Sequence, residues 1–338
     1  MGGPGHKMDR ALGALIGVAL GDALGMPSQT LPRARIAAAY GRITDLIDPV
    51  ADHPVSHGLR AGMVTDDTEQ TLLLADLMIG SPAGVDDRAW AEALLGWERD
   101  VRARGLRDLL GPSSKRALDA LLAGVPASET GREGTTNGAA MRIAPVGIAT
   151  PPGDPAALVA RVAEACRVTH NTREAISAAA AVAMTISLGV AGQSFAAALD
   201  KAMAVARIGA TLGAPVGEAD MAGRIAAAIA LARTGTEEDL ATRIGTSVAS
   251  HEAVPAAFGV VVLAKGDPWQ AGLIAANIGD DTDTIGAIAC AMAGACAGLS
   301  GFPPDKAAQV VAVNRLDLDP VARGLLSIRA RRLAEVSA

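Results

Sequence analysis

Residues 284–304 read TIGAIACAMAGACAGLSGFPP, a stretch without a charged side chain that is built mainly from alanine, glycine and other small residues. A second stretch of this kind, AISAAAAVAMTISLGVAGQSFAAAL, covers residues 175–199. Each is longer than the roughly 18 apolar residues that suffice to cross a membrane. Small residues nevertheless outnumber Leu, Ile and Phe in both, and no aromatic belt flanks either one. We therefore interpret both stretches as buried helices, because small side chains allow neighbouring helix backbones to approach closely.

The rest of the chain also has a helical pattern. No segment shows the apolar and polar alternation of a strand, and no polar linker is long enough to separate two domains. We predict an all-α fold, a compact helical bundle that forms a single domain over residues 1–338, with residues 1–8 disordered. The expected helices cover 11–25, 69–79, 87–102, 114–123, 155–167, 173–191, 194–204, 219–232, 239–245, 255–264, 269–276, 284–299, 305–315 and 321–335.

Charge and cysteine content limit the class of protein. Thirty Lys and Arg against 36 Asp and Glu give a net charge of -6, which is the wrong sign for holding a phosphate backbone. The three cysteines form neither a C-x-x-C pair nor a disulfide framework, and we find no signal peptide. We therefore expect a cytoplasmic protein that binds neither nucleic acid nor a membrane. Its oligomeric state stays open, with a monomer favoured.

Two short acidic clusters carry the candidate chemistry, TDDTE at 65–69 and DDTDT at 280–284. Each lies where a loop ends and an apolar helix begins. In the first cluster Asp66 and Glu69 fit a capping box, so helix capping is the alternative explanation there. The second cluster has three carboxylates within four residues, more than capping needs, and this crowding calls for a cation. Asp and Thr oxygens suit Mg²⁺ or Mn²⁺, whereas the lack of a local His and Cys set argues against zinc.

Taken together, the motifs resemble those of the ADP-ribosylglycohydrolase family and occur in family order over almost the whole chain. They are GALIGVALGDALGMPSQ at 13–29, VTDDTEQTLLLADLM at 64–78, TNGAAMRIAPVG at 136–147, THNTREA at 169–175 and ANIGDDTDTIGAIACAMAGA at 276–295. The resemblance implies an all-α fold with a binuclear Mg²⁺ site, in which Mn²⁺ can substitute. The metal ligands that it implies are Thr65, Asp66, Asp67, Asp281, Asp283 and Thr284.

The activity implied by the resemblance is hydrolysis of an N- or O-glycosidic bond to an ADP-ribosyl group, carried by a protein or a small-molecule acceptor. Two metal ions can fix the ribose hydroxyls and lower the pKa of a bound water that attacks the anomeric carbon. Asp67 and Asp283 are the candidates for orienting or deprotonating this water. The sequence leaves open the linkage, the acceptor and the choice between these two carboxylates.

Five further positions are candidates for substrate binding. Asn137 and Gly138 lie in a glycine-containing loop that allows backbone N–H groups near a phosphate or ribose, and the resemblance places this loop at the substrate. His170 matches a family position beside the ribose. Ser113 or its neighbour Ser114 is either a helix cap or a phosphate contact. Gln29 stands where many family members carry a glutamate that closes over the site, so the amide can alter metal affinity, loop closure or substrate choice.

Two alternative functions remain at this stage. Aromatic residues make up only 2% of the chain, and the candidates for an adenine-binding wall are Tyr40, Trp97 and Phe258. Together with the segment GPSSKRAL, which resembles a bacterial subgroup linked to nucleosides or sugars, this scarcity favours an N-ribosyl hydrolase of nucleoside-like small molecules as the first alternative. A non-catalytic ADP-ribose or nucleotide binding protein is the second, and it is disfavoured because the chain keeps every implied ligand.

Overall fold

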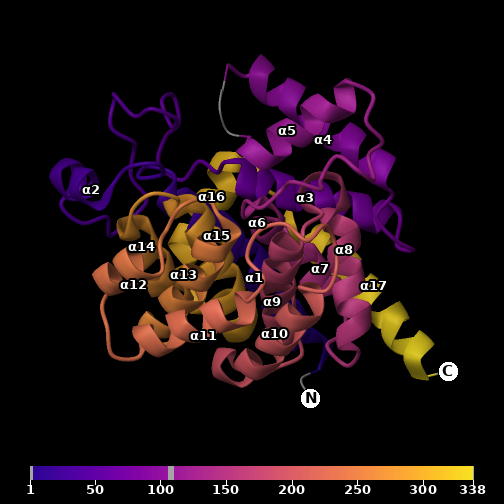
Figure 1. Cartoon of the computed structure of the whole chain (residues 1–338). Coiled ribbons are helices and arrows are strands. Elements are labelled where there is room, and N and C mark those ends of the chain that lie inside the picture. Colours follow the sequence, from indigo (N-terminus) through magenta and orange to yellow (C-terminus); the bar gives the residue numbers. More distant parts are fainter. Residues whose placement is uncertain (1–2, 106–109, 338) are drawn as a thin grey trace.

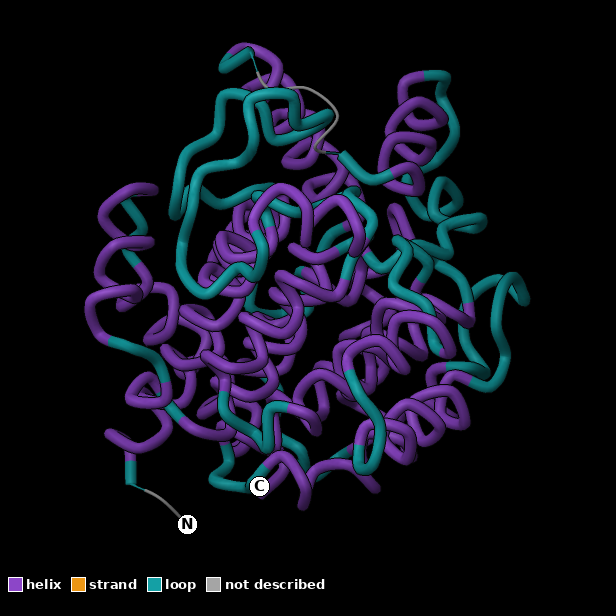
Figure 2. The backbone as a smooth tube through the Cα atoms, turned by 90° about the vertical axis from the view of Figure 1, so that its left-hand side faces the viewer, coloured by secondary structure: helices purple, strands orange, loops and turns teal. Residues whose placement is uncertain are grey.

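The computed structural model describes residues 3–105 and 110–337. These residues form seventeen α-helices and one 3₁₀ turn, and no β-strand occurs among them (Figure 2). Backbone pairing of the β type is limited there to isolated bridges such as the one between Leu31 and Asp280. The predicted all-α fold is confirmed.

Helix α15 (Thr282–Ala297) lies at the centre of the bundle and is buried along nearly its whole length. It packs mainly against four helices, two from distant parts of the chain and two that precede it in sequence (Figure 1). These are α1 (Pro4–Gly25), α9 (Arg173–Val190), α13 (Ser250–Leu263) and α14 (Pro268–Ile278). Helix α9 is long and apolar enough to cross a membrane, but 94% of that segment is buried inside the protein. Neighbouring helices thus cover its apolar surface.

The other helices surround this centre. Those that precede residue 150 are α2 (Arg33–Tyr40), α3 (Asp66–Gly80), α4 (Asp87–Ala103), α5 (Pro112–Leu122), α6 (Gly138–Met141) and α7 (Ala144–Ala149). The remainder are α8 (Pro155–His170), α10 (Phe195–Gly209), α11 (Met221–Ala232), α12 (Glu237–Arg243), η1 (Leu299–Gly301), α16 (Pro304–Asn314) and α17 (Leu318–Ser337).

Two differences from the expected elements concern short or terminal segments. Helices α2, α6 and α7 were not predicted, because each is too short to show a repeating apolar face. Helix α1 begins at Pro4 and so includes residues 4–8, which we expected to be disordered. Residues 1–2 lie outside the described residues.

Helices α1 and α15 approach so closely that their backbones touch. A Cβ on Gly17 would lie 2.2 Å from the carbonyl oxygen of Cys290, which leaves no room for a side chain. A Cβ on Gly25 would lie 2.4 Å from the Cα of Asp283, so the end of α1 meets the first turn of α15. The face of α1 that makes this contact consists of Gly13, Gly17, Gly21 and Gly25.

We predict that Gly17→Ala destabilises the protein by about 2 kcal/mol, because the new methyl group meets backbone atoms that cannot move aside. Gly80→Ala is the matched control, since a Cβ there has no heavy atom within 4 Å and adds only helix propensity. Urea denaturation followed by circular dichroism compares the two. Equal transition midpoints for both variants would contradict the close-packing argument.

Candidate metal centre

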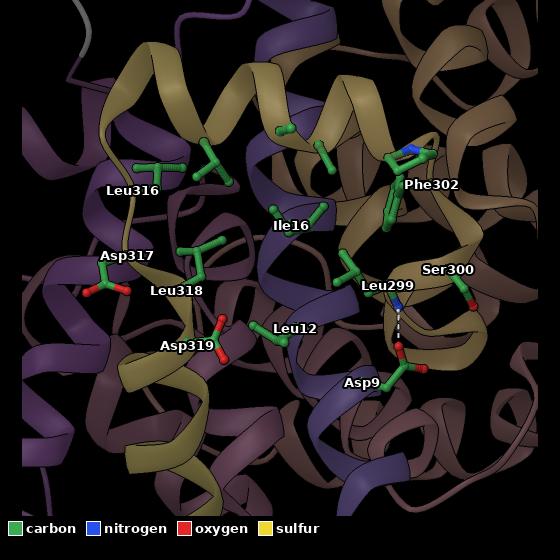
Figure 3. Close-up of a pocket in the computed structure, with 14 residues that line it drawn as sticks. Asp9, Leu12, Ile16, Leu299, Ser300, Phe302, Leu316, Asp317, Leu318 and Asp319 are labelled. Carbon is green, nitrogen blue, oxygen red and sulfur yellow. Dashed lines mark hydrogen bonds between the residues drawn. The ribbon is translucent and has the colours of Figure 1, made fainter.

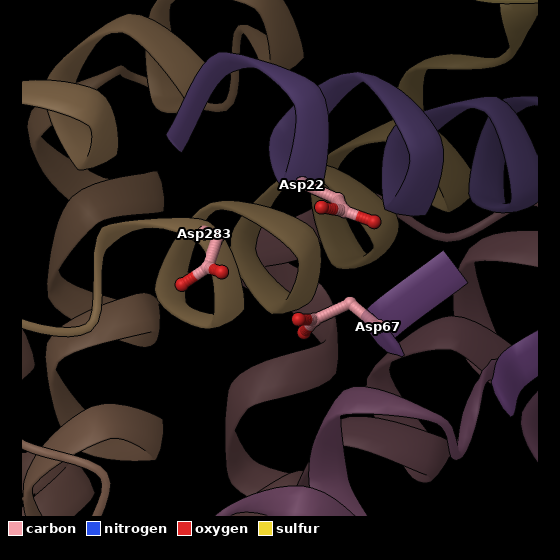
Figure 4. A group of neighbouring side chains, drawn as sticks. All are labelled: Asp22, Asp67 and Asp283. Atoms are coloured by element: carbon pink, nitrogen blue, oxygen red, sulfur yellow. The ribbon is translucent and has the colours of Figure 1, made fainter. Parts of the chain in front are cut away.

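Three carboxylates from three helices meet beside the crossing of α1 and α15. Oxygens of Asp22, Asp67 and Asp283 all lie within 4.8 Å of one another. Figure 4 shows them pointing into a common space from α1, α3 and α15. All three side chains are buried, with exposed fractions of 0%, 1% and 3%. The two acidic clusters of the sequence are thus brought together in space.

Helix capping does not explain the acidic residues at the start of α3 or of α15. The N-cap residues are Thr65 for α3 and Asp281 for α15, and neither side chain accepts a capping hydrogen bond from a backbone N–H of its own first turn. Glu69, the second member of the capping-box pattern, accepts a 2.7 Å hydrogen bond from Trp97 Nε1. It also pairs with Arg104 at 2.7 Å, so it joins α3 to α4 instead.

Asp22 is the site residue that the sequence analysis missed. Its carboxylate accepts hydrogen bonds from the Thr65 hydroxyl at 2.8 Å and the Thr68 hydroxyl at 2.6 Å. It also accepts from the backbone N–H groups of both threonines, at 2.9 and 3.1 Å. Asp22 therefore holds the first turn of α3 in place. The sequence signal was a lone carboxylate in an apolar helix, where a charge needs a partner.

Crowding and burial raise the pKa values of the cluster. Burial raises the pKa of Asp22 and of Asp281 to about 6. Burial and the repulsion of neighbouring carboxylates raise three further pKa values well above the usual range, those of Asp66, Asp67 and Asp283. Ionising the whole set near neutral pH therefore requires a compensating positive charge.

The donor set fits a hard divalent cation. The buried Oδ1 atom of Asp67 has no hydrogen-bond partner within residues 3–105 and 110–337. Its Oδ2 atom lies 3.4 Å from the hydroxyls of both Thr65 and Thr284, two residues that flank the cluster from α3 and α15. Carboxylate and hydroxyl oxygens are the ligands that Mg²⁺ and Mn²⁺ prefer. The cluster is therefore compatible with a metal centre.

A cavity of about 220 Å³ opens beside these carboxylates. Four of the six expected ligands line it, whereas Thr65 and Asp67 lie deeper. The lining consists of Gln29, Thr30, Val55, Asp66, Leu110, Gly111, Pro112, Ser114, Thr136, Asn137, Gly138, Met141, Val248, Asp281, Asp283 and Thr284.

The two residues of the expected glycine-containing loop do reach this cavity. Asn137 is the N-cap residue of the short helix α6, which begins at Gly138. The side-chain amide of Asn137 donates a short hydrogen bond to Asp281 Oδ2. Asn137 therefore orients an expected metal ligand, in addition to facing the cavity.

Two other expected substrate residues do not line the cavity. His170 is fully buried behind Gly138. A Cβ placed on Gly138 would lie only 2.9 Å from the Cε1 atom of the His170 ring. Ser113 is buried as well, and its hydroxyl oxygen accepts a 3.3 Å hydrogen bond from the backbone N–H of Thr136. The neighbouring Ser114 reaches the cavity in its place.

Gln29 lines the cavity and is tied to the loop before α3. Its Nε2 atom donates to the hydroxyl oxygen of Ser56 at 3.0 Å, and that hydroxyl donates in turn to the carbonyl oxygen of Met26 at 2.7 Å. Asp280 is exposed and accepts a 3.0 Å hydrogen bond from the Thr246 hydroxyl, so it stands apart from the carboxylate cluster.

The prediction that Tyr40, Trp97 and Phe258 form an aromatic wall of the site is wrong. Phe258 is fully buried in the core against Phe195, and the Tyr40 hydroxyl donates to the carbonyl oxygen of Pro27 at 2.8 Å. Trp97 is occupied with Glu69. None of the described residues that line the cavity is aromatic. Residues 106–109, which precede the lining residue Leu110, lie outside the described part of the chain.

Size alone does not identify the site. A larger cavity of about 780 Å³ lies between α1, α16 and the start of α17 (Figure 3). Its lining is mostly apolar, with Leu12, Ile16 and Phe302. Its three acidic residues are not part of the carboxylate cluster; they are Asp9, Asp317 and Asp319.

Comparisons with known proteins identify the family of this chain. A family model described as ADP-ribosylglycohydrolase matches residues 4–335. The Escherichia coli (strain K12) protein YegU is 36% identical over 333 residues, which cover 97% of this chain and 99% of that protein. ADP-ribosylarginine hydrolase Tri1 of Pseudomonas putida (strain GB-1) is 29% identical, covering 89% of this chain and 74% of that protein. A solved structure titled ADP-ribosylglycohydrolase-related protein complex matches with a TM-score of 0.67 at 25% identity, covering 96% of this chain and 99% of that one.

The raised pKa values give a prediction for the metal-free protein. A carboxyl whose pKa is raised by folding stabilises the protein fully below its unfolded value of about 4. That contribution is lost as the pH rises through the folded value, about 6 for Asp22 and Asp281. We therefore expect the unfolding temperature of the metal-free protein to fall between pH 4.5 and 7.5, and the fall to be smaller in Asp67→Asn, measured by differential scanning fluorimetry in EDTA.

Bound Mg²⁺ is expected to offset the repulsion between the carboxylates and so to restore the stability that the metal-free protein loses as the pH rises. At 100 times its dissociation constant it adds about 2.7 kcal/mol of stability at pH 7.5, a rise of several degrees, and much less at pH 4.5. Asp67→Asn should show little of this rise. An equal Mg²⁺ effect at both pH values, or in both proteins, would show that the ion binds elsewhere.

Proposed function

We propose the following function for this chain, which belongs to the ADP-ribosylglycohydrolase family and is therefore a hydrolase that acts on glycosyl bonds. It releases an ADP-ribosyl group from an acceptor by Mg²⁺-dependent hydrolysis. The observation that carries the proposal is the meeting of the acidic first turns of α3 and α15 at one wall of a cavity. The acceptor is a protein side chain or a small molecule joined to the ribose by an N- or O-glycosidic bond.

Two Mg²⁺ ions, for which Mn²⁺ can substitute, are held in this proposal by oxygens of six residues. When bound, they supply a polarised water and a fixed position for the ribose hydroxyls. The ligands are Thr65, Asp66, Asp67, Asp281, Asp283 and Thr284. The same carboxylates stay ionised at neutral pH when the cations offset their repulsion.

The position of each carboxylate suggests how the roles are divided. Asp283 lines the cavity, so we assign it the task of orienting the water that attacks the anomeric carbon. Asp67 lies deeper and serves as a metal ligand behind it. Asn137 fixes Asp281 through its side-chain amide, and Asp22 fixes Thr65. The attack breaks the bond between C1 of the ribose and the acceptor atom, which leaves with a proton.

The choice of substrate rests on the relatives. The Pseudomonas putida relative is named as a hydrolase of ADP-ribosylarginine, which favours an ADP-ribosylated protein as the partner here. We propose a cytoplasmic location because the three cysteines are free, as is typical of a reducing compartment. The preference for a monomer stays a prediction from the sequence.

The cavity gives specific support to a second candidate, hydrolysis of a nucleoside-like N-riboside. Its volume of about 220 Å³ is below the roughly 300–1,000 Å³ of sites that enclose drug-sized ligands. Its described lining has no aromatic face for adenine. Both features suit a ribosyl group with a small leaving group. A purely non-catalytic binding role has no such observation in its favour.

A release assay with and without Mg²⁺ tests both candidates. We expect ribosyl release from ADP-ribosyl-arginine, ADP-ribosyl-serine or O-acetyl-ADP-ribose to exceed release from a panel of nucleosides. Asp283→Ala should reduce kcat at least about 100-fold, because an ionised group that acts in the transition state is lost. Asp280→Asn is the matched control, since this exposed neighbour contacts Thr246 and should keep nearly full activity.

Three results of this assay would count against the first candidate. Faster release from nucleosides would favour the second candidate. Activity that survives Asp283→Ala would remove the proposed role of that carboxylate. Full activity in EDTA would remove the role of the metal.

Gln29 gives an independent prediction about the metal. In Gln29→Glu the Ser56 hydroxyl already donates to Met26 O, so the new carboxylate loses its hydrogen bond to Ser56 and turns toward the cation. We expect Mg²⁺ affinity to rise about fivefold, which corresponds to roughly 1 kcal/mol of added Coulomb attraction. Isothermal titration calorimetry measures this, with Gln29→Met as the uncharged control. Equal affinity in the two variants would place residue 29 too far from the metal.

A further inference from the structure

Arg142 is a buried arginine behind the cavity, with an exposed fraction of 1%. Its guanidinium lies over the ring of Trp90, 5.3 Å from the centroid. No carboxylate lies within ion-pair distance of it in the described part of the chain. Burial lowers its pKa to about 10, so the group is still charged at neutral pH. A buried charge without an ion-pair partner is costly, and its hydrogen bonds show what it does.

One hydrogen bond of Arg142 leads to the metal ligands. Its Nη1 atom donates to Gln70 Oε1 at 2.6 Å. A guanidinium can only donate, so the oxygen of this amide must face Arg142. The other end of the amide, Nε2, then donates to Asp66 Oδ2 at 3.3 Å. With the amide reversed, two oxygens would face each other at Asp66.

A second hydrogen bond leads to the opposite wall. The Nη2 atom donates to the hydroxyl oxygen of Thr169. In the described part of the chain the only other partner of that hydroxyl is His170 Nδ1 at 2.7 Å, so its proton has an acceptor only if it points there. Nη2 itself also lies 3.4 Å from Nδ1. Because both neighbours donate, Nδ1 must accept. Burial and the charge of Arg142 lower the pKa of His170 well below its usual value, so the ring is neutral and carries its proton on Nε2.

The chain of donors ends at Thr136. His170 Nε2 donates to the Thr136 hydroxyl oxygen at 3.0 Å, so the hydroxyl proton is not used in that contact. Within the described residues, His170 is the only hydrogen-bond partner of this hydroxyl. Thr136 lines the cavity, and its backbone is held by Ser113 and Ser250 at 3.3 and 2.8 Å. Its proton is therefore available to a molecule in the cavity.

We infer that Arg142 is a positioning residue that fixes hydrogen-bond directions on two walls of the cavity, and that Thr136 is a binding residue that donates its hydroxyl proton to the substrate. The chemical class recognised by Thr136 is an acceptor oxygen without a proton of its own, such as a phosphate oxygen or a ribose ring oxygen. His170 acts through Thr136 and does not itself touch the substrate. The substrate part of this inference rests on the proposed function, whereas the hydrogen-bond directions do not.

The hydrogen-bond directions are tested first, on metal-free protein without ligand. Nitrogen chemical shifts of ¹⁵N-labelled histidine rings report which ring nitrogen carries the proton, and the His170 signals are those lost in His170→Gln. We expect Nε2 to be protonated and Nδ1 to be bare from pH 5.5 to 8. Arg142→Lys should produce a mixture of both forms, because one ammonium group cannot reach Gln70 and Thr169 at once. A proton on Nδ1 in the unmodified protein overturns the inference.

Binding of ADP-ribose in saturating Mg²⁺, measured by calorimetry, tests Thr136. Thr136→Val keeps the shape and removes the hydroxyl, so affinity should fall about threefold to tenfold. Thr136→Ser should restore it, and Mg²⁺ affinity should be unchanged in both variants. Thr135→Val is the matched control, because the adjacent Thr135 does not line the cavity. Unchanged affinity in Thr136→Val, or an equal loss in Thr135→Val, contradicts the inference.

The two measurements separate this inference from the proposed function. If the unmodified protein binds no ADP-ribose, the proposed function fails. The histidine ring signals still decide the role of Arg142 in that case. If ADP-ribose binds but His170 carries its proton on Nδ1, the proposed function stands and the inference fails.

Discussion

Electrostatic repulsion between buried carboxylates is the constraint on which the rest of this molecule depends. Burial is costly for one ionised carboxylate, and here Asp66, Asp67 and Asp283 share a single space with two more. The surrounding residues reduce this cost only in part. Asp22 is occupied by two threonines and Asp281 by an asparagine, while Asp67 keeps an oxygen without a partner. Such crowding is compatible with a cation-binding site, because a bound cation would offset the repulsion between the carboxylates.

Much of the candidate site could be predicted because its proposed ligands are contiguous in sequence. Residues 65–67 and 281–284 each carry several carboxylate and hydroxyl oxygens in one turn, and that density exceeds what helix capping uses. Asp22 could not be found in this way, because the threonines that it holds belong to another helix and the sequence does not show their proximity. The prediction of an aromatic wall was wrong for a related reason. Phe258 and Tyr40 have other partners in the fold, which only tertiary packing reveals.

The helical fold was predictable because the long charge-free stretches are rich in small residues, which allow helices to pack closely against one another. What they did not reveal is which helices pair. The contact between α1 and α15 depends on glycines in one helix that meet backbone atoms of the other. The cavity likewise depends on contacts that the sequence does not show. Arg142 follows the NG motif by a few positions, but its links to Gln70 and Thr169 depend on helices that the sequence does not place side by side.

The pairing of α1 with α15 has a consequence for how the protein is made. The hydroxyls of Ser28 and Thr282, which close this contact, are 254 residues apart in the chain. A ribosome that adds about 5–20 residues per second needs roughly 13–50 s to bridge that distance. Throughout this time the glycine face of the nascent α1 lacks its α15 partner, and Asp281 and Asp283 have not yet been added to the chain. Chaperone protection of the emerging N-terminal helix would therefore matter more here than in a protein whose site is formed from neighbouring segments.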